Sequence, residues 1–327
     1  MPARRSILAA AAACLLPVGS ADGQERPAQT TEPAPKFRSS VDLVSIAAVV
    51  RDRKGRFVSD LSRDDFIVVE AGERKELVGF ETEENGPVRI AVLVDISGSM
   101  RVGSKAVDAG QAARHLFSAL KPGDKAALFS FDTRLDHVHA FTSEFARLEA
   151  ALERVEPPFG QTSLYDAIAE TAQVVADEAS SEGRLPQRAA VVVLTDGVDT
   201  KSRLTPSEVS GIASSIDVPV YVIAVMSVID DPSRVEKDRQ PEMPSSRLRD
   251  LARWTGGELF TAVAPAHASI AARQLVDELR HQYLLAFESS TGSGWRPLEI
   301  RARQRNLVVR ARSGYIVSGR TRPVQER

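Results

Sequence analysis

Oxygen-bearing side chains gather in three short stretches that lie far apart along the chain. The first is Asp95-Ile96-Ser97-Gly98-Ser99, the second is Gly160-Gln161-Thr162, and the third is Thr195-Asp196-Gly197. Five of their side chains form a hard oxygen set, the carboxylates of Asp95 and Asp196 and the hydroxyls of Ser97, Ser99 and Thr162. Such a set suits magnesium, manganese or calcium and suits zinc or copper poorly. We therefore expect these stretches to form one site for a divalent cation, with magnesium as the first expectation.

Two apolar runs place the first and third stretches at the ends of strands. Val88 to Val94 and Ala189 to Leu194 have the length and β-branched content of buried parallel strands. The second stretch precedes a helical apolar stripe that begins at Leu164. In an open α/β sheet, ligands lie at the carboxyl ends of the strands, because the connecting loops converge there. We expect all three stretches to meet at that edge.

The pattern Asp-x-Ser-x-Ser, followed by a later Thr and a later Asp, resembles the metal-ion-dependent adhesion site of von Willebrand factor type A (VWA) domains. All five liganding positions of that site are present: Asp95, Ser97, Ser99, Thr162 and Asp196. The resemblance implies that the serines bind the metal directly, whereas the threonine and the aspartates bind it directly or through water. It also implies that a carboxylate from a partner protein completes the coordination. The alternative is that the serines cap a helix and the aspartates lie in turns.

Strands and helices alternate from Val88 onward, which predicts a doubly wound, mainly parallel sheet with helices on both faces. This is the VWA (Rossmann-like) α/β fold that the resemblance implies for 88–280. An N-terminal β unit (37–87) and C-terminal strands (281–318) are each too small to stand alone, so we expect them to pack into one β-sandwich, followed by a tail at 319–327. With the ending Arg312-Ser313-Gly314-Tyr315, this combination resembles the VWA-related proteins described from Acidobacteria.

The start of the chain has the features of an export signal. Arg4 and Arg5 precede an apolar run from Ile7 to Val18 and then small residues, which predicts a cleaved signal peptide over 1–23 and a flexible linker over 24–36. The only cysteine, Cys14, lies inside that signal, which suits a periplasmic or secreted protein without disulfides. Lipidation of Cys14 is the alternative. No later stretch has the length of a transmembrane helix.

Charge singles out two further segments. The net charge of −2 indicates no general attraction to nucleic acid or anionic membranes. Arg301, Arg303 and Arg305 fall at alternate positions, which predicts a basic strand face that is either solvated or in weak contact with an anionic surface such as a glycan or lipopolysaccharide. The charged, proline-rich stretch 227–245 should emerge beside the metal site. It is either a solvated loop or a loop that selects partners.

The sequence contains no recognisable catalytic constellation. The five histidines are scattered, and the pair His137 and His139 has no further His or Cys ligand nearby in the sequence. There is no nucleophile elbow and no phosphate-binding glycine loop with lysine. We expect an exported, non-enzymatic adhesion-type protein that captures an acidic group of a protein partner. The alternatives are a structural or assembly factor of the cell envelope and, with less support, a metal-dependent phosphoester hydrolase.

Overall fold

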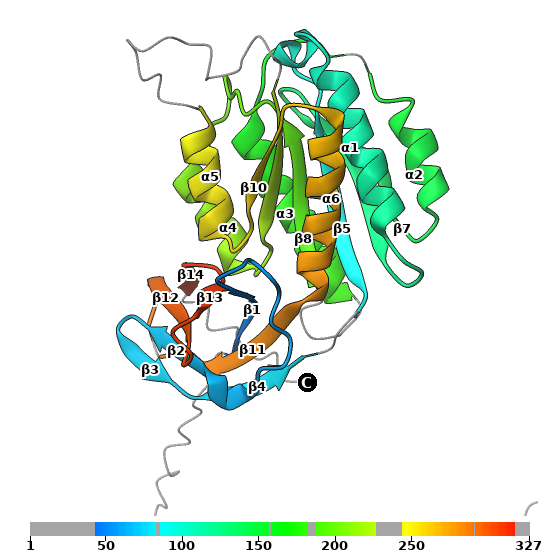
Figure 1. The fold of residues 1–327 in the computed structure, drawn as a ribbon. Helices are drawn as coiled ribbons and strands as arrows, with labels where there is room; N and C mark the ends of the chain where they lie inside the picture. The colour runs from blue at the N-terminus through cyan, green and yellow to red at the C-terminus, as the bar shows by residue number, and fades with distance from the viewer. Residues whose placement is uncertain are drawn as a thin grey trace, which may run out of the picture. The chain divides into compact units, whose positions relative to one another are not determined.

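The computed structural model describes residues 43–82, 86–156, 158–181, 188–226, 244–290 and 292–317 (Figure 1). The expected signal peptide and linker lie outside the described residues, as do 227–243 of the charged loop and the expected tail at 319–327. Within the described residues, no helix is both long enough and apolar enough to cross a membrane.

A six-stranded sheet forms the centre of the predicted VWA region, with the strand order β10-β9-β8-β5-β6-β7. Its strands are β5 (Val88–Asp95), β6 (Lys125–Phe131), β7 (Leu135–Thr142), β8 (Arg188–Thr195), β9 (Val220–Val225) and β10 (Leu259–Ala262). All neighbouring strands pair in parallel except β6 and β7, which are antiparallel. The expected mainly parallel α/β sheet is confirmed.

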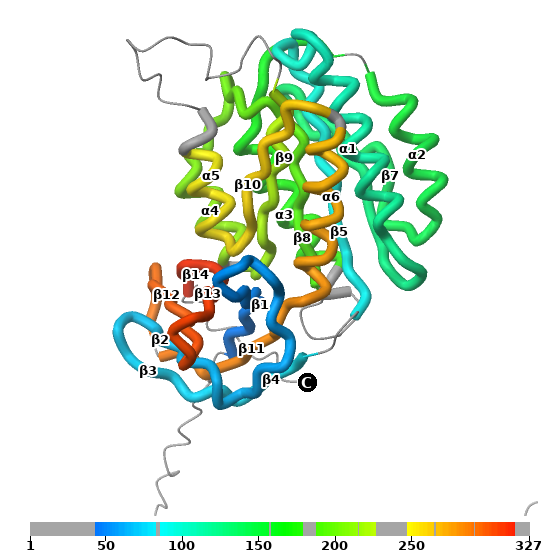
Figure 2. The backbone as a smooth tube through the Cα atoms, viewed as in Figure 1, coloured from blue at the N-terminus to red at the C-terminus, as the bar shows by residue number. Residues whose placement is uncertain are grey.

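Six helices cover the two faces of this sheet, as the tube view shows (Figure 2). They are α1 (Lys105–Ala119), α2 (Phe145–Leu152), α3 (Leu164–Ser181), α4 (Pro206–Ser215), α5 (Pro244–Trp254) and α6 (Pro265–Arg280). Ile90 and Val92 of β5 pack with α1, α2 and α6, whereas Ala91 and Leu93 pack with α3, α4 and α5. Alternate side chains of one strand therefore enter different cores, which explains why β5 is apolar at consecutive positions.

Two four-stranded antiparallel sheets combine the N-terminal and C-terminal strands. One has the order β13-β1-β11-β4 and the other β14-β12-β2-β3. Their bounds are β1 (Leu43–Asp52), β2 (Phe66–Glu70), β3 (Glu73–Lys75), β4 (Leu77–Glu81), β11 (Gln282–Glu288), β12 (Gly294–Ala302), β13 (Leu307–Arg310) and β14 (Gly314–Val317). Ile46 and Phe66 from the N-terminal unit share one core with Phe287 and Ile300 from the C-terminal strands. The two parts thus bury together what neither could bury alone.

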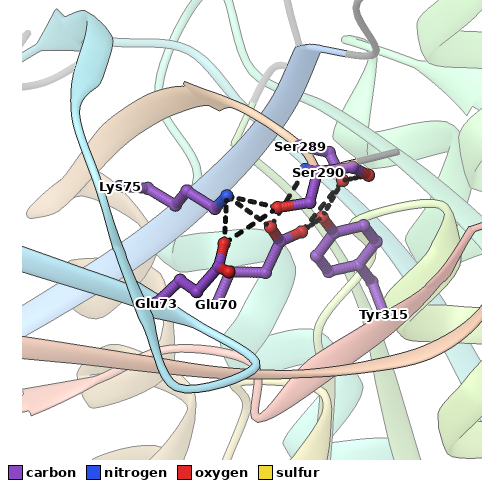
Figure 3. A network of polar contacts seen from close by, with 6 residues as sticks. All are labelled: Glu70, Glu73, Lys75, Ser289, Ser290 and Tyr315. Atoms are coloured by element: carbon purple, nitrogen blue, oxygen red, sulfur yellow. Dashed lines mark hydrogen bonds and ion pairs between the residues drawn. The ribbon is translucent and has the colours of Figure 1, made fainter. Parts of the chain in front are cut away.

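A buried carboxylate joins strands of one sheet to the segment that follows β11 of the other sheet (Figure 3). Glu70 on β2 accepts hydrogen bonds from the Tyr315 hydroxyl on β14, from the Ser289 hydroxyl (2.9 Å) and from the Ser290 N–H (3.1 Å). The ammonium group of Lys75 lies 3.3 Å from the same carboxylate. Burial by itself raises the pKa of Glu70, but these hydrogen bonds outweigh it and lower the pKa to about 2. Glu70 therefore stays ionised inside the sandwich.

The predicted basic strand face is wrong. β12 ends at Ala302, so Arg303 and Arg305 lie in the turn that follows. The N–H of Arg303 donates to the backbone oxygen of Asp65 at 2.8 Å, which fixes the start of that turn. Arg301 remains in the strand, but Glu299 pairs with it at 2.5 Å and offsets its charge. Alternation in the sequence does not give a stripe here, because the strand stops after the first arginine.

Candidate metal site

Three loops meet at the carboxyl edge of the central sheet, and backbone hydrogen bonds join them. The N–H of Gly98 in the first loop donates to the oxygen of Gly160 in the second at 2.9 Å. The oxygen of Thr162 in the second loop accepts from the N–H groups of Thr200 (3.0 Å) and Lys201 (2.8 Å) in the third. The structure therefore brings together the three stretches that carry the five predicted ligands.

Glycine makes the close approach of these loops feasible. A β-carbon at Gly98 would lie 2.9 Å from the oxygen of Gly160, closer than side chains tolerate. Gly160 and Gly197 have φ angles of +85° and +81°, in the region that favours glycine. Glycine at position 98 therefore lets the first two loops lie this close together.

Asp95 ends β5 and is almost fully buried, at 1% exposure. Its Oδ1 accepts from the N–H of Ser97 at 2.9 Å, and its Oδ2 accepts from the Thr195 hydroxyl at 2.5 Å. Burial raises the pKa of Asp95 to about 6, even though these hydrogen bonds oppose the rise. A nearby cation would favour the ionised form of such a carboxylate.

The hydroxyl-bearing residues of the first two loops lie at the same edge of the sheet as this carboxylate. The Oγ atoms of Ser97 and Ser99 are 3.1 Å apart, so two oxygens of the first loop face one another. Thr162 is buried, at 2% exposure, and its N–H donates to the Thr200 hydroxyl at 2.9 Å. The N–H of Leu164, at the start of α3, donates to Asp199 Oδ1 at 2.9 Å. The third loop therefore caps the helix that follows Thr162.

Asp196 follows β8 and engages a partner that the sequence reasoning missed. Its Oδ2 lies 2.9 Å from the ammonium nitrogen of Lys105, the first residue of α1, and its Oδ1 accepts from the N–H of Val198 at 3.2 Å. Nothing in the sequence signals this pair, because its members are far apart in the chain and Lys105 belongs to no motif. Asp199 and Thr200 were also missed, although hydroxyls and carboxylates just after a strand are a recognisable loop signal.

The chemistry of the donor set fits a hard divalent cation. Carboxylate and hydroxyl oxygens from the three loops are the ligand types that magnesium, manganese and calcium take. Among the described residues, no group of three or more His, Cys, Asp or Glu side chains could hold a metal ion. The His137 ring packs edge-on against Phe129, and Nδ1 of His139 lies 2.7 Å from the oxygen of Ala140. A thiolate or imidazole site of the zinc type is therefore not formed in this part of the chain.

Comparison with known families places this site in context. Residues 90–198 match the family model of the von Willebrand factor type A domain. This segment is similar to VWA domains. The match spans about a third of the chain and includes all five predicted ligands. A search of curated proteins found no match to the chain.

Several solved structures are similar to the protein. An aerotolerance-related membrane protein from Bacteroides fragilis is 19% identical, with 59% of this chain and 98% of that chain covered and a TM-score of 0.45. A von Willebrand factor type A protein from Catenulispora acidiphila is 14% identical, with coverages of 84% and 73% and a TM-score of 0.46. Proximal thread matrix protein 1 from the mussel byssus is 17% identical, with coverages of 70% and 49% and a TM-score of 0.45.

Proposed function

We propose that the protein is a non-enzymatic, adhesion-type binding protein that captures an acidic group of a protein partner through a divalent cation, with magnesium as the first candidate. The observation that carries this proposal is the joining of the three loops by backbone hydrogen bonds between Gly98 and Gly160 and between Thr162 and residues 200–201. These bonds hold the oxygen-bearing stretches at one edge of the sheet before any partner arrives. A preorganised site loses less conformational entropy on binding.

The five residues would offer the cation two types of ligand. Asp95 and Asp196 supply negative charge, and the hydroxyls of Ser97, Ser99 and Thr162 supply neutral oxygens. With two carboxylates against a divalent ion, the loaded site is formally neutral, so an incoming carboxylate meets no excess of negative charge. The bound metal supplies a Lewis-acidic point of attachment for a carboxylate of the partner.

We also propose that the protein is exported. The support is the N-terminal sequence, where Arg4 and Arg5 precede an apolar run and small residues. Export would place the site in the periplasm or outside the cell. The β-sandwich of N-terminal and C-terminal strands supports extending the resemblance to the VWA-related proteins described from Acidobacteria beyond the matched segment.

Peptide display would test the proposed recognition directly. We expect peptides panned against the protein in magnesium and eluted with EDTA to be enriched in Asp and Glu. The Asp95→Ala variant should no longer bind the selected peptides. The control variant Asp60→Ala should still bind them, because Asp60 is an exposed residue in the connection between β1 and β2. Peptides without acidic residues, or peptides that bind equally well in EDTA, would refute metal-mediated capture of an acidic group.

One observation favours a second candidate, a structural or assembly role in the cell envelope. The ion pair between Lys105 and Asp196 links α1 to the third loop without any metal. If the protein acts by bracing a complex, partner binding should survive both EDTA and Asp95→Ala. A phosphoester hydrolase is supported less well, because both oxygens of Asp95 and both oxygens of Asp196 already have hydrogen-bond or ion-pair partners, which leaves neither as an unengaged base.

A further inference from the structure

Lys105 forms a buried ion pair with one of the predicted metal ligands. Its ammonium nitrogen lies 2.9 Å from Asp196 Oδ2, and the two side chains are only 5% and 2% exposed. The pair connects residues 91 positions apart in the sequence. It therefore joins the start of α1 to the loop after β8, at the edge of the sheet where the five predicted ligands gather.

The position of Lys105 in its own helix is unfavourable without this carboxylate. Lys105 is the first residue of α1, where the helix dipole is positive and disfavours a cation. Burial adds to the cost of a charged ammonium group. The ion pair with Asp196 helps to offset both costs, so we expect the ammonium group to leave Asp196 only when another cation takes its place.

The two predicted carboxylate ligands differ in this respect. Both oxygens of Asp95 accept hydrogen bonds from neutral groups, the N–H of Ser97 and the hydroxyl of Thr195. Asp196 instead has one oxygen on an ammonium group and the other on the N–H of Val198. A metal ion that binds Asp196 through Oδ2 must first displace Lys105.

We propose that the Lys105 ammonium group competes with the divalent cation for Asp196. This competition weakens metal binding and restricts the site to ions whose charge exceeds that of the ammonium group. The inference rests on the proposed metal-dependent function and adds a mechanism that sets the affinity of the site. When the ion binds, the Lys105 ammonium leaves Asp196. A monovalent ion offers Asp196 no more charge than the ammonium already does, so exchange should favour divalent ions.

Calorimetric titration of magnesium into the purified parent and Lys105→Met tests this competition. We expect Lys105→Met to bind magnesium about tenfold more tightly, a change of about 1.4 kcal/mol. We also expect the metal-free variant to melt at a lower temperature than the parent, because a buried carboxylate has lost its partner. Lys105→Arg keeps a cation at this position and should retain the weaker binding. Lys201→Met is the matched control, because it removes an exposed positive charge from the third loop. Its magnesium affinity should be much closer to that of the parent than the affinity of Lys105→Met is.

The possible outcomes separate this inference from the proposed function. If Lys105→Met binds magnesium with unchanged or weaker affinity, Lys105 positions Asp196 instead of competing for it, and the inference is wrong while the metal site stands. If neither protein binds magnesium, manganese or calcium, the proposed metal site itself fails and the inference fails with it.

A second measurement covers the case in which Lys105→Met does not fold without metal. In the parent, NMR of labelled lysine side chains should show one signal, absent from Lys105→Arg, that shifts in step with magnesium binding. Magnesium binding with no change in that signal would overturn the inference.

Discussion

Replacing Tyr315 with phenylalanine should destabilise the β-sandwich by removing one hydrogen bond from a buried carboxylate. Glu70 is 1% exposed, so water does not readily replace the lost donor. A hydrogen bond to a charged group contributes about 1.5–3 kcal/mol. The Ser289 hydroxyl and the Ser290 N–H remain in place, at 2.9 and 3.1 Å. We therefore expect Tyr315→Phe to lower the free energy of unfolding by about 2 kcal/mol.

Denaturant unfolding followed by circular dichroism measures this loss. Tyr165→Phe, on α3, is the matched control, because it removes the hydroxyl of a buried tyrosine that lies outside the Glu70 network. The same Tyr315→Phe change made in Glu70→Gln should cost less, since the acceptor is no longer charged. A loss below about 0.5 kcal/mol, or an equal loss in the Glu70→Gln background, would refute the assignment of this energy to the carboxylate.

Three further predictions concern pH, a buried ion pair and the loop contact. The pKa of Glu70 falls from 4.5 to about 2 on folding, which contributes about 3 kcal/mol to the free energy of unfolding. This contribution should be complete above pH 4.5 and lost as the pH falls toward 2. In Glu70→Gln the free energy of unfolding should therefore decline less steeply on acid titration. Arg280 and Asp124 form an ion pair at 2.5 Å, and their side chains are only 3% and 1% exposed. Arg280→Met should therefore lower the free energy of unfolding by about 3–5 kcal/mol, measured by thermal or denaturant unfolding. A loss below about 1 kcal/mol would contradict this prediction. Gly98→Ala should weaken magnesium binding about tenfold, because the added β-carbon forces the first two loops apart. Gly110→Ala is the control: its β-carbon would meet nothing closer than 3.8 Å, so this variant should bind magnesium like the parent.

The central strands were predictable because their signals are local and strong, and the composite sandwich was predictable because each terminal β unit is too small to stand alone. β5 and β8 are buried on both faces, so their sequences are apolar at consecutive positions. β7 was missed because it is an edge strand whose side chains are half-buried or exposed and mixed in character. β10 is only four residues long, too short for a pattern to stand out from a loop.

The candidate site was predictable only in part, for a similar reason. The oxygen-bearing residues lie next to recognisable strands, and their pattern of Asp-x-Ser-x-Ser with a later Thr and a later Asp can be found in the sequence. Lys105 pairs with a residue far along the chain, and only the approach of α1 to the loop after β8 brings the two together. Long-range charge pairs of this kind depend on tertiary packing, which local periodicity does not encode.

The most direct test of the proposed metal site is a calorimetric titration of magnesium, manganese and calcium into the folded parent, Asp95→Ala and Asp196→Ala. We predict one bound ion per chain in the parent and loss of binding in both variants, each of which should keep the circular dichroism spectrum of the parent. No binding by the parent up to about 10 mM ion, beyond the range of weak extracellular calcium sites, would contradict it. So would undiminished binding by Asp95→Ala.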